Sequence, residues 1–370
     1  MNKIILVGNG FDLSLGLKTH YKDFLTHLFK TKLLLALDNP DPRTRGNAHR
    51  GSIDDKLVKI LLSGYYSKDI YEKEISSITN WEEFLKFKEE FKSYCQITCN
   101  SFFLKNIYNT ADSLGWVDLE HIYFKLLLRC VDGHNDINKI NEEKEIITNE
   151  LEAYLKIISE EKIDYQSITQ KHKRIFYSPI ELNEIAYTQS DKKWAPENIY
   201  LINFNYTPII PRIAELLNVA SNRPAVDVNS IHGKINDKSN PIIFGYGDEE
   251  HEHYRKIEEM NINAYLDHIK SFDYLRTLNY RRMLGYLNSS YIVYIYGHSC
   301  GLSDRIMLKQ IFENKNCHSI KIFYHERPDG TNDFRTKCQD ISRHFTSNSL
   351  MRQRIIPFEQ SEPLPQLANT

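Results

Sequence analysis

Polar residues directly follow five apolar stretches of this 370-residue sequence, and many of them could bind a ligand or transfer a proton. They are Gly8, Asn9, Gly10 and Asp12 after the first stretch; Asn205, Tyr206 and Thr207 after the second; His232 and Gly233 after the third; 245–248 after the fourth; and Gly297, His298 and Ser299, with the later Asp304, after the fifth. An open parallel sheet binds ligands beyond the carboxyl ends of its strands. If the apolar stretches are strands, these residues line one site. Taken singly, each could instead be a helix cap or a tight turn.

The first group forms a glycine-rich turn. Four apolar residues, Ile4–Val7, predict a strand buried on both faces, and from Leu13 onward apolar residues have helical spacing. A strand, a glycine turn and a helix can together present backbone N–H groups to a phosphate. The full dinucleotide-binding fingerprint has glycine where this chain has Leu13, so an ordinary strand-to-helix turn is the alternative.

The segment 297–301 (Gly-His-Ser-Cys-Gly) matches the nucleophile elbow of serine hydrolases and follows a predicted strand. Ser299 would be the nucleophile. Its partners would have to be Asp333 or Asp340 and then His344. The motif sits late in the chain and leaves room for about one further strand. A serine hydrolase is therefore an alternative and not the leading prediction.

An acidic run at 248–253 contains two histidines and could ligate a metal ion. Its charge is contiguous, and no distant partner ligand is evident, which favours a solvated loop. We predict no metal site. Nor does any acidic cluster elsewhere indicate a nuclease.

Six apolar stretches are candidates for the strands that would position these residues, and helical patterns lie between several of them. The stretches are 4–7, 199–204, 226–231, 241–246, 291–296 and 319–324, and the intervening helical patterns are 208–219, 264–287 and 304–314. This alternation predicts an α/β fold with a doubly wound parallel sheet of about six strands.

Between the first two strands lies a long region without the α/β pattern. Residues 39–51 are rich in proline and glycine and predict a loop, and helical stripes follow at 53–65, 81–94, 121–131 and 137–158. Cys95 and Cys99 are expected to share a helix face. We predict a discontinuous core at 1–30 and 195–350, a helical insertion at 31–194, and a flexible tail at 357–370.

Composition narrows the classes of function. Lys and Arg total 47 against 49 acidic residues, so the net charge is −2 and binding of nucleic acid through overall charge is not expected. The six cysteines include no C-x-x-C pair, which argues against structural zinc and for buried thiols in a reducing compartment. No apolar stretch is long enough to span a membrane. We expect a cytoplasmic protein without a membrane partner.

Taken in order, the polar blocks resemble the AbiH family of bacterial phage abortive-infection proteins. The matching segments are 5–12, 16–19, 21–24, 116–120, 203–207, 231–233 and 297–299 with Asp304. The most distinctive block is the opening Gly-Asn-Gly-Phe-Asp. The resemblance implies a role in anti-phage defence, either as a homo-oligomer or with a partner defence protein.

More distantly, the same order is similar to the sirtuin-like domains of phage-defence effectors, some of which cleave the nicotinamide–ribose bond of NAD. This similarity implies a Rossmann-like (sirtuin-like) core with NAD as substrate or ligand. It makes Asn205 and His232 the catalytic pair. The other strand-end residues would contact the nucleotide: Gly8, Asn9 and Gly10 at the pyrophosphate; Asp12, His298 and Asp304 at the nicotinamide or ribose; and Phe11, Tyr206, Thr207, Gly233, Gly297 and Ser299 around them. Sirtuin deacetylases carry a zinc module that this chain lacks, and Thr207 stands where an aspartate is usual.

The chemistry of this pair suits such a reaction. Cleavage of the bond needs positioning and modest acid–base help. The imidazole of His232 can accept a proton from water or a ribose hydroxyl, and the Asn205 amide can orient water and hold a hydroxyl. We therefore predict an NAD-hydrolysing abortive-infection effector. The alternative is a non-catalytic nucleotide-binding sensor that acts through a partner.

Trp116, Leu119 and Glu120 would share one face of a helix in the insertion. We expect this face to dock the insertion on the sheet. Contact between Glu120 and the ligand is the alternative.

Overall fold

The computed structural model describes residues 1–41, 49–111, 116–185, 192–219 and 223–366. Its contacts divide the chain into two compact units. Unit 1 comprises Met1–Leu17 and Leu155–Thr370, and unit 2 comprises Lys18–Tyr154. The boundaries therefore fall at 17/18 and 154/155, whereas the sequence suggested boundaries near 30 and 195.

Unit 1 is built on a six-stranded sheet in which every pair of neighbours is parallel. Its strands are β1 (Asn2–Val7), β7 (Ile199–Asn203), β8 (Val226–Ser230), β9 (Tyr291–Tyr296), β10 (Cys317–Tyr324) and β11 (Glu362–Pro363). They are arranged in the order β11-β10-β9-β1-β7-β8. All residues of β1 and β9 are buried, as expected for strands covered on both faces.

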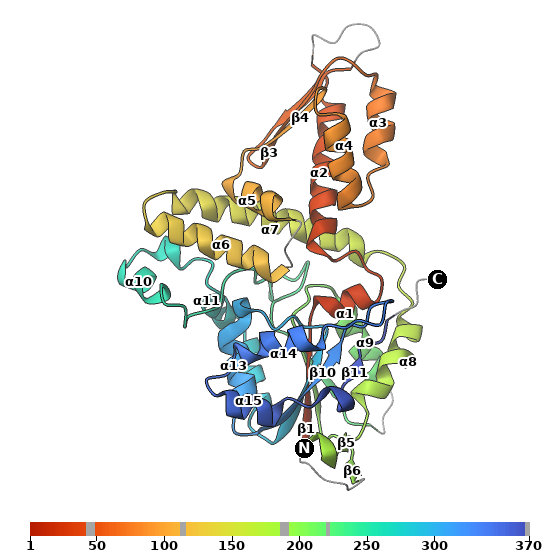
Figure 1. Ribbon diagram of the computed structural model, residues 1–370, viewed down its shortest axis with the longest axis vertical. Coiled ribbons are helices and arrows are strands. Elements are labelled where there is room, and N and C mark those ends of the chain that lie inside the picture. Colours follow the sequence, from red (N-terminus) through yellow and green to blue (C-terminus); the bar gives the residue numbers. More distant parts are fainter. Residues whose placement is uncertain (42–48, 112–115, 186–191, 220–222, 367–370) are drawn as a thin grey trace. The chain divides into compact units, whose positions relative to one another are not determined.

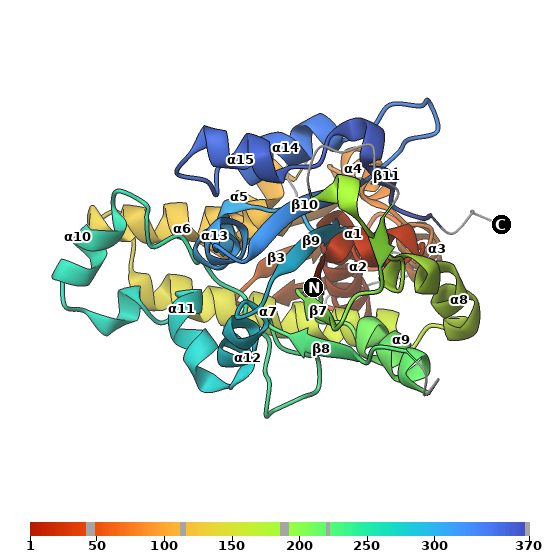
Figure 2. The same ribbon diagram turned by 90° about the horizontal axis from the view of Figure 1, so that it is seen from below.

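Helices flank both faces of this sheet (Figure 2). The helices of unit 1 are α1 (Asn9–Ser14), α8 (Tyr165–Phe176), α9 (Ile209–Asn218), α10 (Tyr254–Glu259), α11 (Lys270–Asp273), α12 (Asn279–Tyr286), α13 (Arg305–Glu313), α14 (Phe334–Ser342) and α15 (Asn348–Arg354). Met283 of α12 and Leu308 of α13 join the core over the face that carries Leu6. On the other face, His172 of α8 contacts the Tyr296 hydroxyl. The α/β prediction is confirmed.

Unit 2 combines helices with a three-stranded antiparallel sheet, β2-β3-β4 (Figure 1). Its elements are α2 (Tyr21–Asp38), β2 (Gly51–Asp54), β3 (Val58–Leu62), α3 (Lys68–Ser76), α4 (Trp81–Glu90), β4 (Cys95–Cys99), α5 (Phe102–Thr110), α6 (Trp116–Val131) and most of α7 (Ile137–Ser159). Phe29 of α2 stacks on Phe84 of α4 with ring centroids 4.9 Å apart. The helix expected at 53–65 is a hairpin, and Cys95 and Cys99 lie on a strand.

Two further predictions about secondary structure were wrong. The segment 241–246 forms no strand and makes only one isolated bridge, from Tyr246 to Ile269. Pro241 has no N–H to donate, and the glycines that follow approach other backbone closely, which favours a loop. The sixth strand is instead β11, within the predicted flexible tail, where Glu362 pairs with Phe323. Residues 367–370 of that tail lie outside the described residues.

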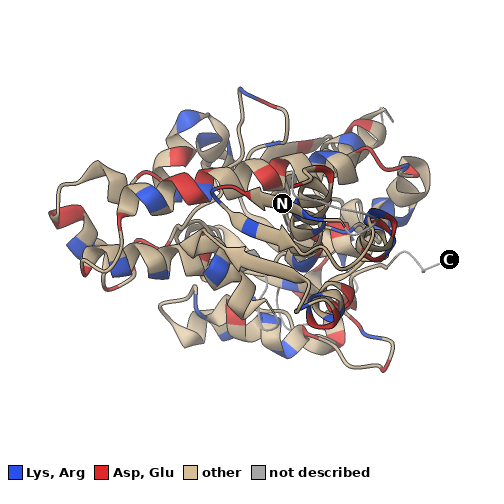
Figure 3. Cartoon of the chain, turned by 90° about the horizontal axis from the view of Figure 1, so that it is seen from above, with Lys and Arg blue, Asp and Glu red and all other residues tan. Residues whose placement is uncertain are grey.

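The charged residues of both units are mixed in sign along the elements (Figure 3). Within the described residues, no helix is long and apolar enough to cross a membrane.

Candidate functional site

The site lies where the strand order of the sheet reverses. β7 and β8 lie on one side of β1, whereas β9, β10 and β11 lie on the other. At such a reversal the connections leave in opposite directions beyond the carboxyl ends of the strands, and ligands of open parallel sheets bind there. The residues that follow β1, β7, β8 and β9 are brought together at this edge.

The glycines of the first turn allow two backbone segments to touch. A Cβ on Gly8 would lie 2.6 Å from the His298 Cα, and one on Gly10 would lie 2.7 Å from the Gly297 oxygen. Gly297 itself has a φ of +76°. Glycine is therefore required at these three positions, where the backbone after β1 contacts the backbone after β9.

The same contact uses up backbone donors that were expected to hold a phosphate. The Gly8 N–H donates to Tyr296 O, the Gly10 N–H to Gly297 O, and the Phe11 N–H to Gly8 O. A pyrophosphate could not bind these three groups without breaking bonds within the protein. Pyrophosphate binding at Gly8, Asn9 and Gly10 stays a prediction, and it would have to use groups other than these three N–H groups.

Asp12, Asn205 and Thr207 form a buried hydrogen-bonded group beneath the turn. The Asn205 amide donates to Asp12 Oδ1 (3.0 Å) and Gly8 O (3.1 Å), and the Thr207 hydroxyl donates to Asp12 Oδ2 (2.7 Å). Asp12 is only 1% exposed. Burial raises the pKa of Asp12 to about 7, although the bonds from Thr207 and Asn205 act in the opposite direction. Asp12 thus positions Asn205 from below the site.

His232 belongs to a second group, centred on the carboxylate of Asp304. Asp304 Oδ1 lies 3.0 Å from His232 Nε2 and accepts a hydrogen bond of 2.8 Å from Lys270 Nζ. Tyr274 OH lies 3.1 Å from the same His232 nitrogen. Burial alone would raise the pKa of Asp304, but the Lys270 charge and the hydrogen bond from His232 outweigh it and hold the pKa well below its usual value.

These contacts assign the tautomer of His232. An ionised carboxylate only accepts hydrogen bonds, so Nε2 carries the proton that faces Asp304. In the neutral ring Nδ1 then holds the lone pair. Among the described residues none makes a hydrogen bond to Nδ1. His232 is therefore held by one nitrogen and can act as a base through the other.

His298 has a supporting role beside this group. Its Nδ1 accepts a hydrogen bond from the Cys300 N–H (3.0 Å), so Nε2 is protonated and faces Asp304 Oδ2 at 3.7 Å. Burial lowers the pKa of His298 to about 3, against the opposing charge of Asp304. The Phe204 ring contacts both histidines, with centroids 4.0 Å from His298 and 5.0 Å from His232.

The remaining predicted residues contribute to the frame around these groups. Phe11 packs in the core against Tyr296 and His172. The Tyr206 hydroxyl donates to Ile243 O. Gly233 has a φ of +87° and closes the turn after His232. Asn9 is partly exposed. No bound nucleotide is needed to explain the positions of Phe11 and Gly233.

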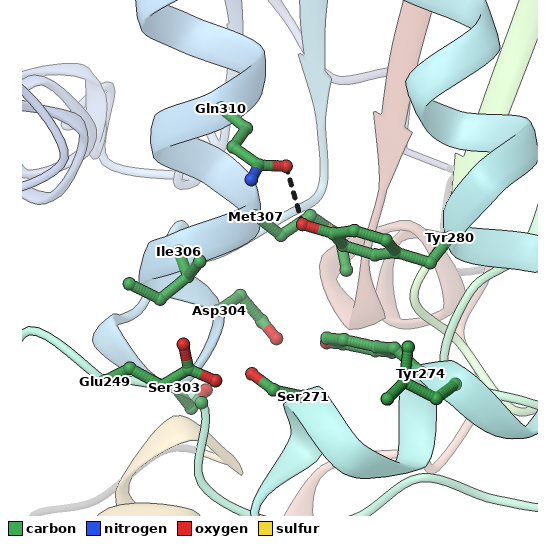
Figure 4. Close-up of a pocket in the computed structure, with 11 residues that line it drawn as sticks. Glu249, Ser271, Tyr274, Tyr280, Ser303, Asp304, Ile306, Met307 and Gln310 are labelled. Atoms are coloured by element: carbon green, nitrogen blue, oxygen red, sulfur yellow. Dashed lines mark hydrogen bonds between the residues drawn. The ribbon is translucent and has the colours of Figure 1, made fainter. Parts of the chain in front are cut away.

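A pocket of about 200 Å³ opens beside Asp304 (Figure 4). Tyr274 forms part of its wall, together with Ser271 and Ser303. Its lining residues come from α11, α12, α13, the segments between them, and the loop before α10 that contains Gly247 and Glu249. The Asp304 carboxylate therefore contacts His232 and also borders an open space.

The serine hydrolase alternative finds no support in the geometry. Ser299 is exposed. His344, its supposed base, is 1% exposed and donates from Nε2 to the Cys300 carbonyl at 2.7 Å. Asp333 accepts from the His325 N–H. These residues do not form a triad.

The acidic run 248–253 forms ion pairs instead of a ligand cluster. Asp248 pairs with Arg305 at 3.3 Å, and Glu250 pairs with Lys309. Across the part of the chain that the structure describes, no three His, Cys, Asp or Glu side chains are grouped closely enough to hold a metal ion.

Sequence reasoning missed Lys270 and Tyr274. Both fall in 264–287, which has helical spacing but folds as short helices and turns. A pair of glycines could have given a signal. A Cβ on Gly245 would lie 2.2 Å from His268 O, and one on Gly247 would lie 2.5 Å from Ser303 O. These glycines allow the Lys270 segment to approach Asp304.

A comparison with protein-family models identifies the family of this chain. The family model described as bacteriophage abortive infection AbiH matches residues 4–326. No curated protein matches the chain. The match includes helix α6, but the side chains of 112–118, Trp116 among them, lie outside the described residues. The proposed roles of Trp116 and Glu120 stay predictions.

Proposed function

This chain belongs to the AbiH family of bacteriophage abortive-infection proteins, and we propose that it acts by hydrolysing the nicotinamide–ribose bond of NAD. The observation that carries the proposal is His232, which is fixed through Nε2 by Asp304 while Nδ1 is left for a ligand. The position of this histidine at the reversal of the strand order supports a nucleotide as that ligand.

The topology adds support for a dinucleotide. Numbered along the chain, the six strands lie in the order 6-5-4-1-2-3, which read from the other edge is the order of doubly wound dinucleotide-binding sheets. A Rossmann-like, sirtuin-like core is part of the proposal. The nucleotide would lie across the carboxyl ends of β1, β7 and β8.

In this mechanism His232 is the general base. Nδ1 accepts a proton from water, or from a ribose hydroxyl, as the bond to nicotinamide breaks and positive charge develops on the ribose. The Asp304 carboxylate stabilises the imidazolium that results, because it lies 3.0 Å from the other ring nitrogen. Lys270 keeps Asp304 ionised, so that the carboxylate accepts a hydrogen bond throughout.

Asn205 is the orienting residue. Both hydrogens of its amide nitrogen are used, one by Gly8 O and one by Asp12. Its carbonyl oxygen is the group left to hold a ribose hydroxyl or the attacking water. Asp12 and Thr207 fix which way the amide points, so the site is organised before a ligand binds.

The test is to incubate the purified full-length protein with NAD and measure released nicotinamide. We expect His232→Ala and Asn205→Ala each to lower the rate at least about 100-fold. His318→Ala is the matched control, because His318 is an exposed histidine on β10, and it should keep the wild-type rate.

A second readout separates catalysis from binding. NAD binding to the wild type and to His232→Ala is measured by calorimetry. Binding without any nicotinamide release would contradict hydrolysis and favour a nucleotide sensor that acts through a partner. If the wild type neither releases nicotinamide nor binds NAD, then NAD is not its ligand.

A further inference from the structure

The pocket beside Asp304 is lined by a second carboxylate, that of Glu249, which pairs with no cation among the residues that the structure describes. In the run 248–250, Asp248 pairs with Arg305, and Glu250 pairs with Lys309. The middle residue, Glu249, lines the pocket. Among the described residues, none makes a hydrogen bond or an ion pair with the Glu249 carboxylate. Figure 4 shows this carboxylate directed toward Ser271 and Asp304.

A buried hydroxyl in the wall of the same pocket also lacks a partner. Ser303 is 1% exposed, and its Oγ has no hydrogen-bond partner among the described parts of the chain. An unpartnered buried hydroxyl costs free energy, so such a group indicates a place for a polar atom from outside the chain. This observation is independent of the Glu249 carboxylate.

Two tyrosine rings complete the enclosure. Tyr274 and Tyr280 are stacked, with centroids 5.5 Å apart and planes 13° apart. The Tyr280 hydroxyl donates to Gln310 Oε1 at 2.6 Å, which holds the ring across the pocket from Asp304. Burial and the Glu249 charge raise the pKa of Tyr280, while the bond to Gln310 acts against them. The Tyr280 ring therefore stays neutral, and both rings offer the electron-rich faces of tyrosine.

The volume of the pocket and the side chains that line it favour an organic cation over a metal ion. A volume of about 200 Å³ is below that of sites that enclose drug-sized ligands, so the occupant is compact. The two carboxylates, Glu249 and Asp304, supply too few ligands for the six or more oxygens that Ca²⁺ takes. Aromatic faces beside a carboxylate suit an organic cation instead.

We propose that this pocket binds a compact organic cation, such as a quaternary ammonium or an alkylpyridinium group. Glu249 supplies the counter-charge, the Tyr274 and Tyr280 rings contact the cation, and Ser303 Oγ bonds to a polar atom of the ligand. Because Tyr274 and Asp304 also contact His232, a cation bound here would lie beside the proposed base. Binding of the cation does not depend on NAD hydrolysis.

The test uses choline and its uncharged analogue 3,3-dimethylbutan-1-ol, which have the same shape and hydroxyl but differ in charge. Calorimetric titration of the full-length protein at low ionic strength should show one choline site, with the neutral analogue at least about tenfold weaker. The Glu249→Gln substitution should weaken the binding of choline about tenfold. Glu252→Gln is the control and should leave binding unchanged, because the Glu252 side chain is 82% exposed.

Three results would overturn the proposal: no choline binding, equal binding of the neutral analogue, or full affinity in Glu249→Gln. If Glu249→Gln fails to fold, as judged by circular dichroism, Tyr280→Leu replaces it with the same expected loss. Competition with NAD distinguishes two sources of the cation. Displacement of choline would assign the pocket to a cationic ring carried by the nucleotide, whereas simultaneous binding would assign it to a separate small molecule.

Discussion

Unit 1 contains two largely buried clusters of charged and polar residues, and they differ in whether a ligand can reach them. The sheet cluster comprises Lys3, Glu184, Tyr294, Lys321 and Glu362, and the site cluster comprises His232, Lys270, Tyr274, His298 and Asp304. In the sheet cluster, Lys3 Nζ donates to three carbonyls and the Ser178 hydroxyl, and Lys321 bridges the two glutamates. In the site cluster, His232 keeps one nitrogen available, and the pocket begins at Asp304.

A buried charge alone does not indicate function. Both clusters contain residues with strongly shifted pKa values: burial lowers the pKa of Lys3 to about 7 and that of His298 to about 3. Of the two clusters, only the site cluster combines a titratable group that is held through one nitrogen, His232, with an adjoining pocket. Perturbed groups mark a functional site when a ligand can reach them.

The largest effect is expected for Asp304→Asn. The amide removes the negative charge that faces the fully buried Lys270 ammonium, which should lower the free energy of unfolding by about 4 kcal/mol. Urea denaturation at pH 7 measures this loss. Glu215→Gln, in an exposed pair with Arg212, should cost less than about 1 kcal/mol. If Asp304→Asn also lowered the free energy of unfolding by less than about 1 kcal/mol, the burial of Lys270 would not depend on the Asp304 charge.

Asp12→Asn should change how stability depends on pH. The folded pKa of Asp12 is raised to about 7 from 3.8, so the native state binds the extra proton between these values. The contribution of Asp12 to the free energy of unfolding is fully present below pH 3.8 and is lost as the pH rises through 7. From pH 5 to pH 7 the wild type should lose about 2 kcal/mol relative to Asp12→Asn. Urea curves at the two pH values check this; a constant difference would contradict it.

Lys3→Met tests the sheet cluster, with the opposite sign. The folded pKa of Lys3 is lowered from 10.5 to about 7, so its burial costs stability that is regained as the pH rises from 7 toward 10.5. Between pH 7 and pH 9 the wild type should gain about 2 kcal/mol relative to Lys3→Met. Nicotinamide release should be unchanged in this variant. A loss of release equal to that of His232→Ala would erase the distinction between the two clusters.

Tyr274→Phe should have the smallest effect. It removes the hydroxyl beside His232 Nε2 but leaves the bond to Asp304, so stability should fall by about 1 kcal/mol. Nicotinamide release should fall no more than about tenfold, because Asp304 still fixes the ring. A loss as large as that of His232→Ala would make Tyr274 and not Asp304 the residue that holds the base.

The residues that the sequence placed correctly are those with a local signal. Runs of buried apolar residues identify β1 and β9, and parallel strands end at one edge, which brings His232 near Asp304. Lys270 has no such signal, because its burial depends on a carboxylate 34 positions away. Nothing in a single sequence shows that pairing.

The errors also have physical causes. Apolar residues at 53, 57, 60 and 61 fit a helical stripe, yet Val58, Ile60 and Leu62 alternate as on a strand and are buried in the hairpin. Strand β11 is two residues long and includes Pro363, which is too short for any periodicity to appear. The glycines at 8 and 10 resemble a phosphate-binding turn, but their donors serve the contact with β9. Local pattern cannot distinguish these uses of glycine.

We infer that the site cluster carries the defence function of this family member. The most direct test challenges bacteria that express the wild type, His232→Ala or Lys3→Met with a phage against which the wild type protects, at matched expression. We predict that plaque formation is restored by His232→Ala and stays suppressed by Lys3→Met. Protection by a folded His232→Ala variant equal to that of the wild type would contradict the account.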